Sequence, residues 1–207
     1  QQPPPPPQPI LRPFSALHSL PAPPADFTGR TREVEQLLAD LTPIPSPDRR
    51  GVRGEVGVAI SGLAGMGGVG KTALALVVAH RLAENYADAQ IYIELKGTSA
   101  TPLSPTEAMI QVIHAFEPKA DLRQATKDDI AARYRSLLDG KRALLLLDNA
   151  ADAWQVNPLL PPSTCAVLVT SRRFFTLPGL QPLRLDVMPE ADARDLLLKL
   201  CPRIDGH

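Results

Sequence analysis

Eight consecutive residues, Gly65 to Thr72 (GMGGVGKT), combine glycines with a lysine and a threonine in an order that suits a polyphosphate. Backbone N–H groups can wrap around phosphate oxygens there, because side chains on the last three glycines would block that approach or forbid the required dihedral angles. Lys71 is expected to reach the β- and γ-phosphates, and the Thr72 hydroxyl is expected to bind Mg²⁺. The segment therefore predicts a phosphate-binding loop for ATP or ADP with Mg²⁺.

The sequence around this loop gives it the right structural setting. An apolar strand is predicted over 55–62 before it, and a helix over 71–84 after it. The unpaired N–H groups and the dipole at the start of that helix add positive potential where the phosphates would lie. The residues expected to contact nucleotide in this segment are Met66, Gly67, Gly68, Val69, Gly70, Lys71, Thr72 and Ala73.

Two further polar groups follow apolar runs. Arg142–Asp148 (RALLLLD) is continuously apolar, as expected of a strand covered on both faces of a parallel sheet. Ligands of open parallel sheets bind at the carboxyl ends of strands, so Asp148 is expected near Mg²⁺, through a water. Arg172 follows the apolar run 165–170 and offers planar, permanently charged donors that suit a γ-phosphate. The expected catalytic residues are Lys71, Asp148 and Arg172, and the expected metal ligands are Thr72 and Asp148.

Asn149 occupies the position after Asp148 where many P-loop ATPases carry a second acidic residue that polarises the attacking water. An amide can orient a water but cannot accept its proton. Slow hydrolysis, or none, is therefore expected from the isolated chain. Asp152 lies one turn further on and could substitute, although a surface or helix-capping role is the stronger expectation for it.

Strands and helices alternate along the chain, which predicts a doubly wound α/β sheet. Ser104 to Glu107 (SPTE) is a capping box with proline at the first helical position, and Thr126 caps the next helix, which Gly140 ends. Trp154 is expected to pack its helix against the sheet. The predicted strands are 55–62, 90–95, 142–148, 165–170 and 182–185, and the predicted helices are 31–41, 71–84, 105–116, 126–139, 151–160 and 189–200.

Prolines concentrate in residues 1–25, which are predicted to form a semi-rigid linker, with a PxxP ligand as the functional alternative. The nucleotide-binding domain is expected over 26–188. Residues 189–207 are expected to hold a closing helix and the start of a truncated helical region, since the chain looks like a piece of a longer protein.

The 22 basic and 22 acidic residues cancel, so no basic surface for nucleic acid or an anionic membrane is expected. No apolar run is long enough for a membrane span, and no secretory signal is present, so a cytoplasmic location is expected. Cys165 and Cys201 form no motif and are interpreted as small apolar residues in a reducing compartment.

Four motifs in this order resemble the STAND signal-transduction NTPases, in particular their NB-ARC branch in bacterial regulators. Phe27-Thr28-Gly29-Arg30 is similar to that family's FVGR-type entry, and Gly65–Ala75 (GMGGVGKTALA) to its P-loop. Leu144–Ala150 (LLLLDNA) resembles its Walker B strand, Val169–Arg172 (VTSR) its sensor 1, and Ile93–Ala108 a stretch found in bacterial members. The resemblance covers about residues 26–200.

The resemblance implies a three-layer P-loop NTPase fold of the ASCE type, with a parallel five-stranded sheet in the order 5-1-4-3-2. It implies that Phe27, Thr28, Gly29 and Arg30 contact the adenine and ribose side, with Ala73 nearby. It also implies a switch, in which ADP holds an inactive state and ATP exchange is coupled to opening and possible homo-oligomerisation. The implied partners are flanking sensor and effector domains of the same protein.

Three functions stay open at this point. The first is a slowly hydrolysing switch module, and the second is a nucleotide-binding scaffold without turnover. The third, a phosphotransferase, would need an acceptor site and a mobile arginine-bearing lid, neither of which the sequence indicates.

Overall fold

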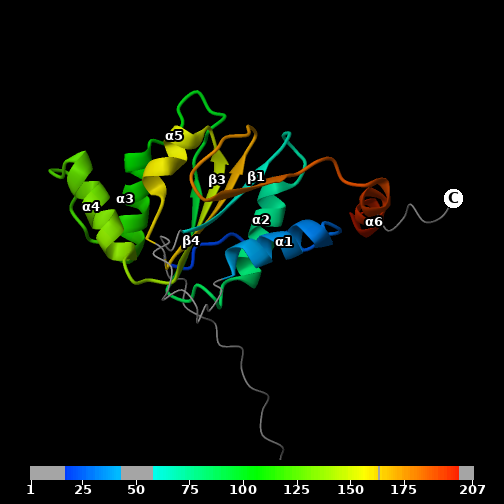
Figure 1. Cartoon of the computed structure of the whole chain (residues 1–207), viewed down its shortest axis with the longest axis horizontal. Helices are drawn as coiled ribbons and strands as arrows, with labels where there is room; N and C mark the ends of the chain where they lie inside the picture. Colours follow the sequence, from blue (N-terminus) through cyan, green and yellow to red (C-terminus); the bar gives the residue numbers. More distant parts are fainter. Residues whose placement is uncertain (1–16, 43–57, 163, 201–207) are drawn as a thin grey trace, which may run out of the picture.

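The structure, a computed structural model, describes residues 17–42, 58–162 and 164–200. Its centre is one sheet of five parallel strands in the order β2-β3-β4-β1-β5 (Figure 1). Counted from the opposite edge this is 5-1-4-3-2, so the predicted order and the sensor strand between the two phosphate-binding strands are confirmed. The strands are β1 Ala59–Ala64, β2 Ala89–Glu94, β3 Ala143–Ala150, β4 Ala166–Ser171 and β5 Leu180–Arg184.

Helices cover both faces of the sheet and give a three-layer domain. In Figure 1, α1 and α2 lie on one side, α3 and α4 lie on the other, and α6 lies apart at the far end. Capping boxes at Ser104 and Thr126 start α3 and α4, as predicted. The helices are α1 Thr31–Leu41, α2 Lys71–Arg81, α3 Pro105–Phe116, α4 Lys127–Leu138, α5 Ala153–Val156 and α6 Glu190–Leu200, with a 3₁₀ turn at Asn157–Leu159.

The leucine run of β3 is buried on both faces because the two helical layers each take alternate residues. Leu145 and Leu147 pack into the cluster beneath α3 and α4. Leu144 and Leu146 pack into the cluster beneath α1 and α2. This alternation explains why a central parallel strand reads as a continuous apolar run rather than as an alternating one.

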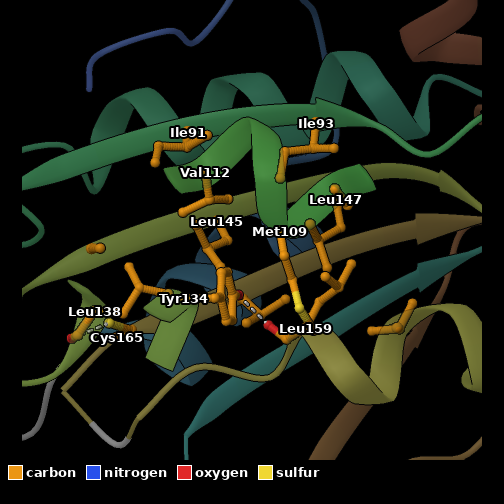
Figure 2. Packing of buried hydrophobic residues seen from close by; sticks show 14 of the residues in the cluster. Ile91, Ile93, Met109, Val112, Tyr134, Leu138, Leu145, Leu147, Leu159 and Cys165 are labelled. Carbon is orange, nitrogen blue, oxygen red and sulfur yellow. Dashed lines mark hydrogen bonds between the residues drawn. The ribbon is translucent and has the colours of Figure 1, made fainter. Parts of the chain in front are cut away.

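Tyr134 and Cys165 belong to the cluster beneath α3 and α4; Figure 2 shows Tyr134 near Leu159 and Cys165 near Leu138. Tyr134 is fully buried, and its hydroxyl donates a hydrogen bond of 2.6 Å to the carbonyl of Leu159. The Cys165 thiol is buried against the carbonyl oxygen of Leu138, at 3.6 Å. Cys165 is thus the small core residue that the sequence indicates, whereas Cys201 lies outside the described residues.

One core prediction is wrong, since Trp154 is 77% exposed. The α5 helix is a single turn that ends before Pro158, where a 3₁₀ turn replaces the predicted continuation. The buried side of α5 consists of Val156 and Gln155. The side-chain amide of Gln155 donates to the carbonyls of Leu95 and Leu103. A single turn cannot bury three consecutive side chains, so the tryptophan faces solvent.

Part of the proline-rich segment packs on the domain. Gln90 of the edge strand β2 donates its N–H to Leu17 O at 2.7 Å and accepts from Ser19 N at 2.9 Å. His18 hydrogen-bonds the Gln90 side chain at 2.8 Å, so these residues shield an otherwise open sheet edge. Three predicted segments lie wholly or partly outside the described residues: residues 1–16 of the linker predicted over 1–25, residues 55–57 of the first strand, and residues 201–207. No helix in the described ranges has the length and apolar character needed to cross a bilayer.

Candidate nucleotide-binding site

The glycine-rich loop joins β1 to α2 at the carboxyl edge of the sheet. Gly68 and Gly70 have φ angles of 83° and 92°, which L side chains rarely adopt. A Cβ on Gly65 would stand 2.3 Å from the backbone oxygen of Leu185. The loop conformation therefore depends on glycine for two reasons, a left-handed backbone and a close approach to the segment after β5.

A polar cavity of about 380 Å³ opens between this loop and the ends of β2, β3 and β4. Asp148 lies on its floor and is 4% exposed. Its carboxylate accepts hydrogen bonds from the hydroxyls of Thr72 (2.8 Å), Tyr92 (3.0 Å) and Thr170. The lining residues are Gly67, Gly68, Gly70, Lys71, Thr72, Ala73, Glu94, Asp148, Asn149, Thr170, Ser171 and Arg172.

The donor set in this cavity fits a magnesium ion. Thr72 Oγ1 and the Asp148 carboxylate supply oxygen ligands, and Asp148 forms no ion pair among the described residues although it is buried. No group of three or more His, Cys, Asp or Glu side chains in the described ranges could hold a metal by itself. Mg²⁺ suits such a site because it commonly takes one or two protein oxygens and completes its shell with phosphate and water.

Lys71 and Arg172 bring positive charge to the same cavity. Lys71 Nζ donates to the carbonyls of Gly65 (2.9 Å) and Met66 (2.6 Å). Burial, and then the neighbouring Arg172 charge, lower the pKa of Lys71, while the Asp148 carboxylate opposes that shift. The exposed Arg172 guanidinium lies 3.5 Å from where a Cβ on Gly67 would stand, and it forms no hydrogen bond with the described residues. It is therefore available to an anion held by the loop.

A second, mainly apolar cavity of about 690 Å³ lies on the other side of the same loop. Its walls come from the segment before α1, from the residues after β5 and from α6. Gly67, Gly68, Gly70 and Ala73 line both cavities, so one ligand could extend across the loop from the polar space into the apolar one. The remaining lining residues are Pro24, Asp26, Phe27, Thr28, Arg30, Met66, Val69, Val187, Met188, Ala193, Leu196 and Leu197.

Arg30 lines the apolar cavity, yet its guanidinium is engaged by the protein itself. It is 6% exposed and donates to Asp186 O at 2.6 Å and to Val69 O at 3.4 Å. It also pairs with Glu33 at 3.0 Å, and its own backbone is left-handed at the start of α1. Arg30 thus joins α1, the glycine-rich loop and the segment after β5.

The other members of the FTGR segment connect to α6. Thr28 accepts a hydrogen bond of 2.7 Å from Lys199 Nζ. Gly29 does not line the cavity, and a Cβ there would meet the Asp192 carboxylate at 2.3 Å. Phe27 packs against the core beneath α1 and α2 while lining the cavity. The segment is therefore a wall of the apolar cavity and the contact point for α6.

The carboxyl ends of β2 and β3 add partners that the sequence analysis missed. Asn149 has φ 56°, and its amide donates to Glu94 at 3.0 Å and to Thr98 at 3.2 Å. Glu94 lies one residue before the end of the predicted strand 90–95 and ends β2, and that position at the carboxyl edge was the available signal for it. Asp152 accepts from the backbone N–H of Gln155 at 3.0 Å, which confirms its helix-capping role.

The fold is similar to solved P-loop ATPase structures at low sequence identity. The ORC1 protein of Aeropyrum pernix in complex with DNA has a TM-score of 0.52 and 17% identity, over 85% of this chain and 50% of that chain. The Escherichia coli MS115-1 HORMA:CdnC:Trip13 complex has a TM-score of 0.54 and 16% identity, over 88% and 71%. Such distant likeness bears on the fold alone, and it confirms the α/β P-loop architecture.

Sequence relatives are much closer. The regulatory protein AfsR of Streptomyces coelicolor is 43% identical over 183 residues, and AfsR of Streptomyces griseus is 42% identical. In both cases the alignment covers 87% of this chain and 18% of the relative, so the chain spans about a fifth of the curated proteins it matches. Residues 50–175, more than half of the chain, match the NB-ARC domain. The chain belongs to the NB-ARC domain family and is a nucleotide-binding module of the P-loop type.

Proposed function

We propose that the chain is the nucleotide-binding switch module of a cytoplasmic STAND-type signalling protein. It binds ADP and ATP with Mg²⁺, and slow ATP hydrolysis controls oligomerisation or the activation of an effector. Flanking sensor and effector domains of the same protein are its partners, in keeping with relatives that are about five times longer than the matched region.

The observation that carries the proposal is the pair of cavities that share Gly67, Gly68, Gly70 and Ala73. The polar cavity has the cations and hydroxyls that phosphates require, in Lys71, Thr72 and Arg172. The apolar cavity offers the aromatic and aliphatic walls that a purine base requires. A nucleoside polyphosphate is the ligand that needs both environments, joined across a glycine-rich loop.

Mg²⁺ would be held by Thr72 and Asp148, and it would neutralise charge on the bound phosphates. The hydroxyls of Tyr92 and Thr170 also donate to Asp148 and fix the orientation of its carboxylate. Lys71 turns from the carbonyls of Gly65 and Met66 to phosphate oxygens when nucleotide enters.

A scaffold that binds nucleotide without hydrolysing it is the second candidate. The observation that favours it is Asn149, an amide in the position after Asp148 whose two N–H groups are already bonded to Glu94 and Thr98. The two candidates differ in turnover alone, so measured phosphate release separates them.

The nucleotide that the chain carries is the first measurement. Purified chain is denatured and the released ligand is separated by chromatography, and affinities for ADP and ATP are then measured by calorimetry with and without Mg²⁺. We expect bound ADP, and a Lys71→Ala variant should bind at least about 10-fold more weakly, because a charge-assisted hydrogen bond contributes about 1.5–3 kcal/mol. Lys119→Ala, an exposed lysine without a hydrogen bond in the described structure, is the matched control.

An empty chain that takes up neither ADP nor ATP would refute nucleotide binding by this domain in isolation. Equal affinities for Lys71→Ala and Lys119→Ala would refute the assignment of the polar cavity. Sedimentation of the chain with ADP, and with an ATP analogue that resists hydrolysis, tests the coupling to oligomerisation; one identical monomeric state with both ligands would contradict it.

A further inference from the structure

Two carboxylates line the polar cavity, and the proposed function has used one of them. Glu94 ends β2 directly beside Asp148 in the parallel register of β2 and β3. The following N–H, of Leu95, donates to Asp148 O at 2.8 Å, so the two strand ends are locked side by side. Glu94 and Asp148 therefore face the same space from neighbouring strands.

Two N–H groups orient the Glu94 carboxylate, and the single Tyr92 hydroxyl proton is shared between Glu94 and Asp148. Asn149 Nδ2 donates to Oε1 at 3.0 Å, and the backbone N–H of Lys96 donates to the same oxygen at 3.1 Å. The hydroxyl of Tyr92 lies 3.2 Å from Oε2 and also 3.0 Å from an oxygen of Asp148. Glu94 forms no ion pair within the described structure, so its carboxylate is held by neutral groups and keeps acceptor capacity toward the cavity.

The backbone around this carboxylate adopts conformations that are costly for ordinary residues. Asn149 and Lys96 are both left-handed, with φ angles of 56° and 54°. Gly97 N–H donates to Asn149 O at 2.6 Å, and a Cβ on Gly97 would stand 2.2 Å from the Ala151 nitrogen. Non-glycine residues keep a left-handed backbone where the surrounding contacts compensate for its cost, and such residues are common at functional sites. The conformation of Asn149 is what turns its amide toward Glu94.

We infer that Glu94 is the general base of ATP hydrolysis in this chain and that Asn149 positions it. The inference rests on the proposed function. Where many P-loop ATPases have an acidic residue directly after Asp148, this chain has Asn149, and we assign the role of that acidic residue to Glu94 on the neighbouring strand. Glu94 accepts a proton from a water whose oxygen forms a bond to the γ-phosphorus. The bond between that phosphorus and the bridging oxygen breaks, and its electron pair leaves with ADP. The protonated Glu94 returns its proton to solvent after orthophosphate departs.

The test compares Glu94→Gln with the wild-type chain in single-turnover hydrolysis and in nucleotide affinity. Glutamine keeps the size and an acceptor oxygen but cannot take the proton. We expect the single-turnover rate constant for ATP hydrolysis, and with it kcat, to fall by at least about 100-fold. This is within the range that general bases contribute. Affinities for ADP and ATP should stay within about 3-fold, and the nucleotide recovered from the variant after loading with ATP should be ATP rather than ADP.

Two further variants separate chemistry from structure. Glu84→Gln changes an exposed glutamate beyond the far end of α2 and should hydrolyse ATP at the wild-type rate. Asn149→Gly removes the side-chain donor to Glu94 and tolerates the left-handed backbone, and it should lower kcat by about 10- to 100-fold without changing ATP affinity, because a misplaced base is less effective.

A Glu94→Gln chain that hydrolyses ATP at the wild-type rate would overturn the inference. It would also be overturned if the variant required more Mg²⁺ for binding but kept its kcat, since Glu94 would then support the metal. A wild-type chain that binds ATP without hydrolysing it overturns the general base and leaves nucleotide binding intact. If a separate binding measurement shows that the wild-type chain binds no nucleotide, the proposed function itself is refuted.

Discussion

Replacing Arg30 by methionine separates two roles for the FTGR segment. The resemblance to the family places Arg30 on the adenine and ribose side, whereas in the structure its guanidinium is engaged with Asp186 O, Val69 O and Glu33. Methionine keeps most of the apolar stem and removes the charge. If the structure describes the main role of Arg30, the substitution destabilises the domain itself, with or without nucleotide.

The magnitude follows from the contacts that are lost. A hydrogen bond from a charged donor contributes about 1.5–3 kcal/mol, which applies to the part-buried bond from Arg30 to Asp186 O at 2.6 Å. Glu33 is partly exposed and can be solvated, so the loss of its pair at 3.0 Å adds about 1 kcal/mol or less. The 3.4 Å contact with Val69 is weak and adds little. The expected decrease in the free energy of unfolding is about 2–4 kcal/mol. For a chain of this size, each kcal/mol lowers Tm by roughly 2–4 °C.

The measurement is urea denaturation of the ligand-free chain, followed by circular dichroism. Arg32→Met is the matched control, because Arg32 lies two residues later in the first turn of α1, is exposed, and forms no hydrogen bond among the described residues. A wild-type free energy of unfolding in Arg30→Met, together with a large loss of ADP affinity, would refute the reasoning and support a direct contact with nucleotide. Loss of stability in both variants would show that charge on α1, rather than the three specific contacts, is responsible.

Three smaller predictions concern buried polar groups. Burial raises the pKa of Tyr86 to about 12, above the value of about 10 expected in the unfolded chain. The buried neutral side chain therefore stabilises the fold fully below about pH 10, and this stabilisation is lost as the pH rises through 12. Tyrosinate absorbance that appears near pH 10 with an intact circular dichroism spectrum would contradict this. The Ser61 hydroxyl is buried without a hydrogen-bond partner in the described structure, so Ser61→Ala should raise the free energy of unfolding by about 1 kcal/mol in urea, and a decrease would reveal a partner. Burial raises the pKa of the Cys165 thiol, so a Cys201→Ser chain should react with a thiol reagent only after denaturation, and rapid labelling of the native chain would disprove burial of Cys165.

The phosphate-binding loop and the central strand that ends near Asp148 could be predicted because each rests on strong local rules. A glycine-rich loop between a strand and a helix identifies the carboxyl ends of the strands as the ligand-binding side of the sheet. The apolar run ending at Asp148 has the pattern of a central parallel strand. Capping boxes at Ser104 and Thr126 satisfy helix N–H groups within four residues, so they are visible in the sequence. The strand order came from the family resemblance, because local patterns do not specify which strands become neighbours.

The missed features depend on contacts between distant parts of the chain. Arg30 bonds Asp186 across 156 residues, and no local pattern reports that contact. Glu94 becomes relevant only because β2 and β3 end in register, which places it beside Asp148. Trp154 was predicted to pack a helix over 151–160 against the sheet, but the observed one-turn helix buries only Gln155 and Val156.

For the proposed switch, the contacts among these residues give the route by which we expect a change at the phosphates to reach the rest of the protein. The glycine-rich loop is the wall that the two cavities share, so movement of its backbone alters both at once. Arg30 joins Val69 of this loop to Asp186, directly before the segment that leads into α6. The α6 helix has no buried residue, and its Lys199 bonds Thr28 beside Arg30. An element with little buried surface opens at low cost, so under the proposed switch α6 is the element whose position we expect nucleotide to change.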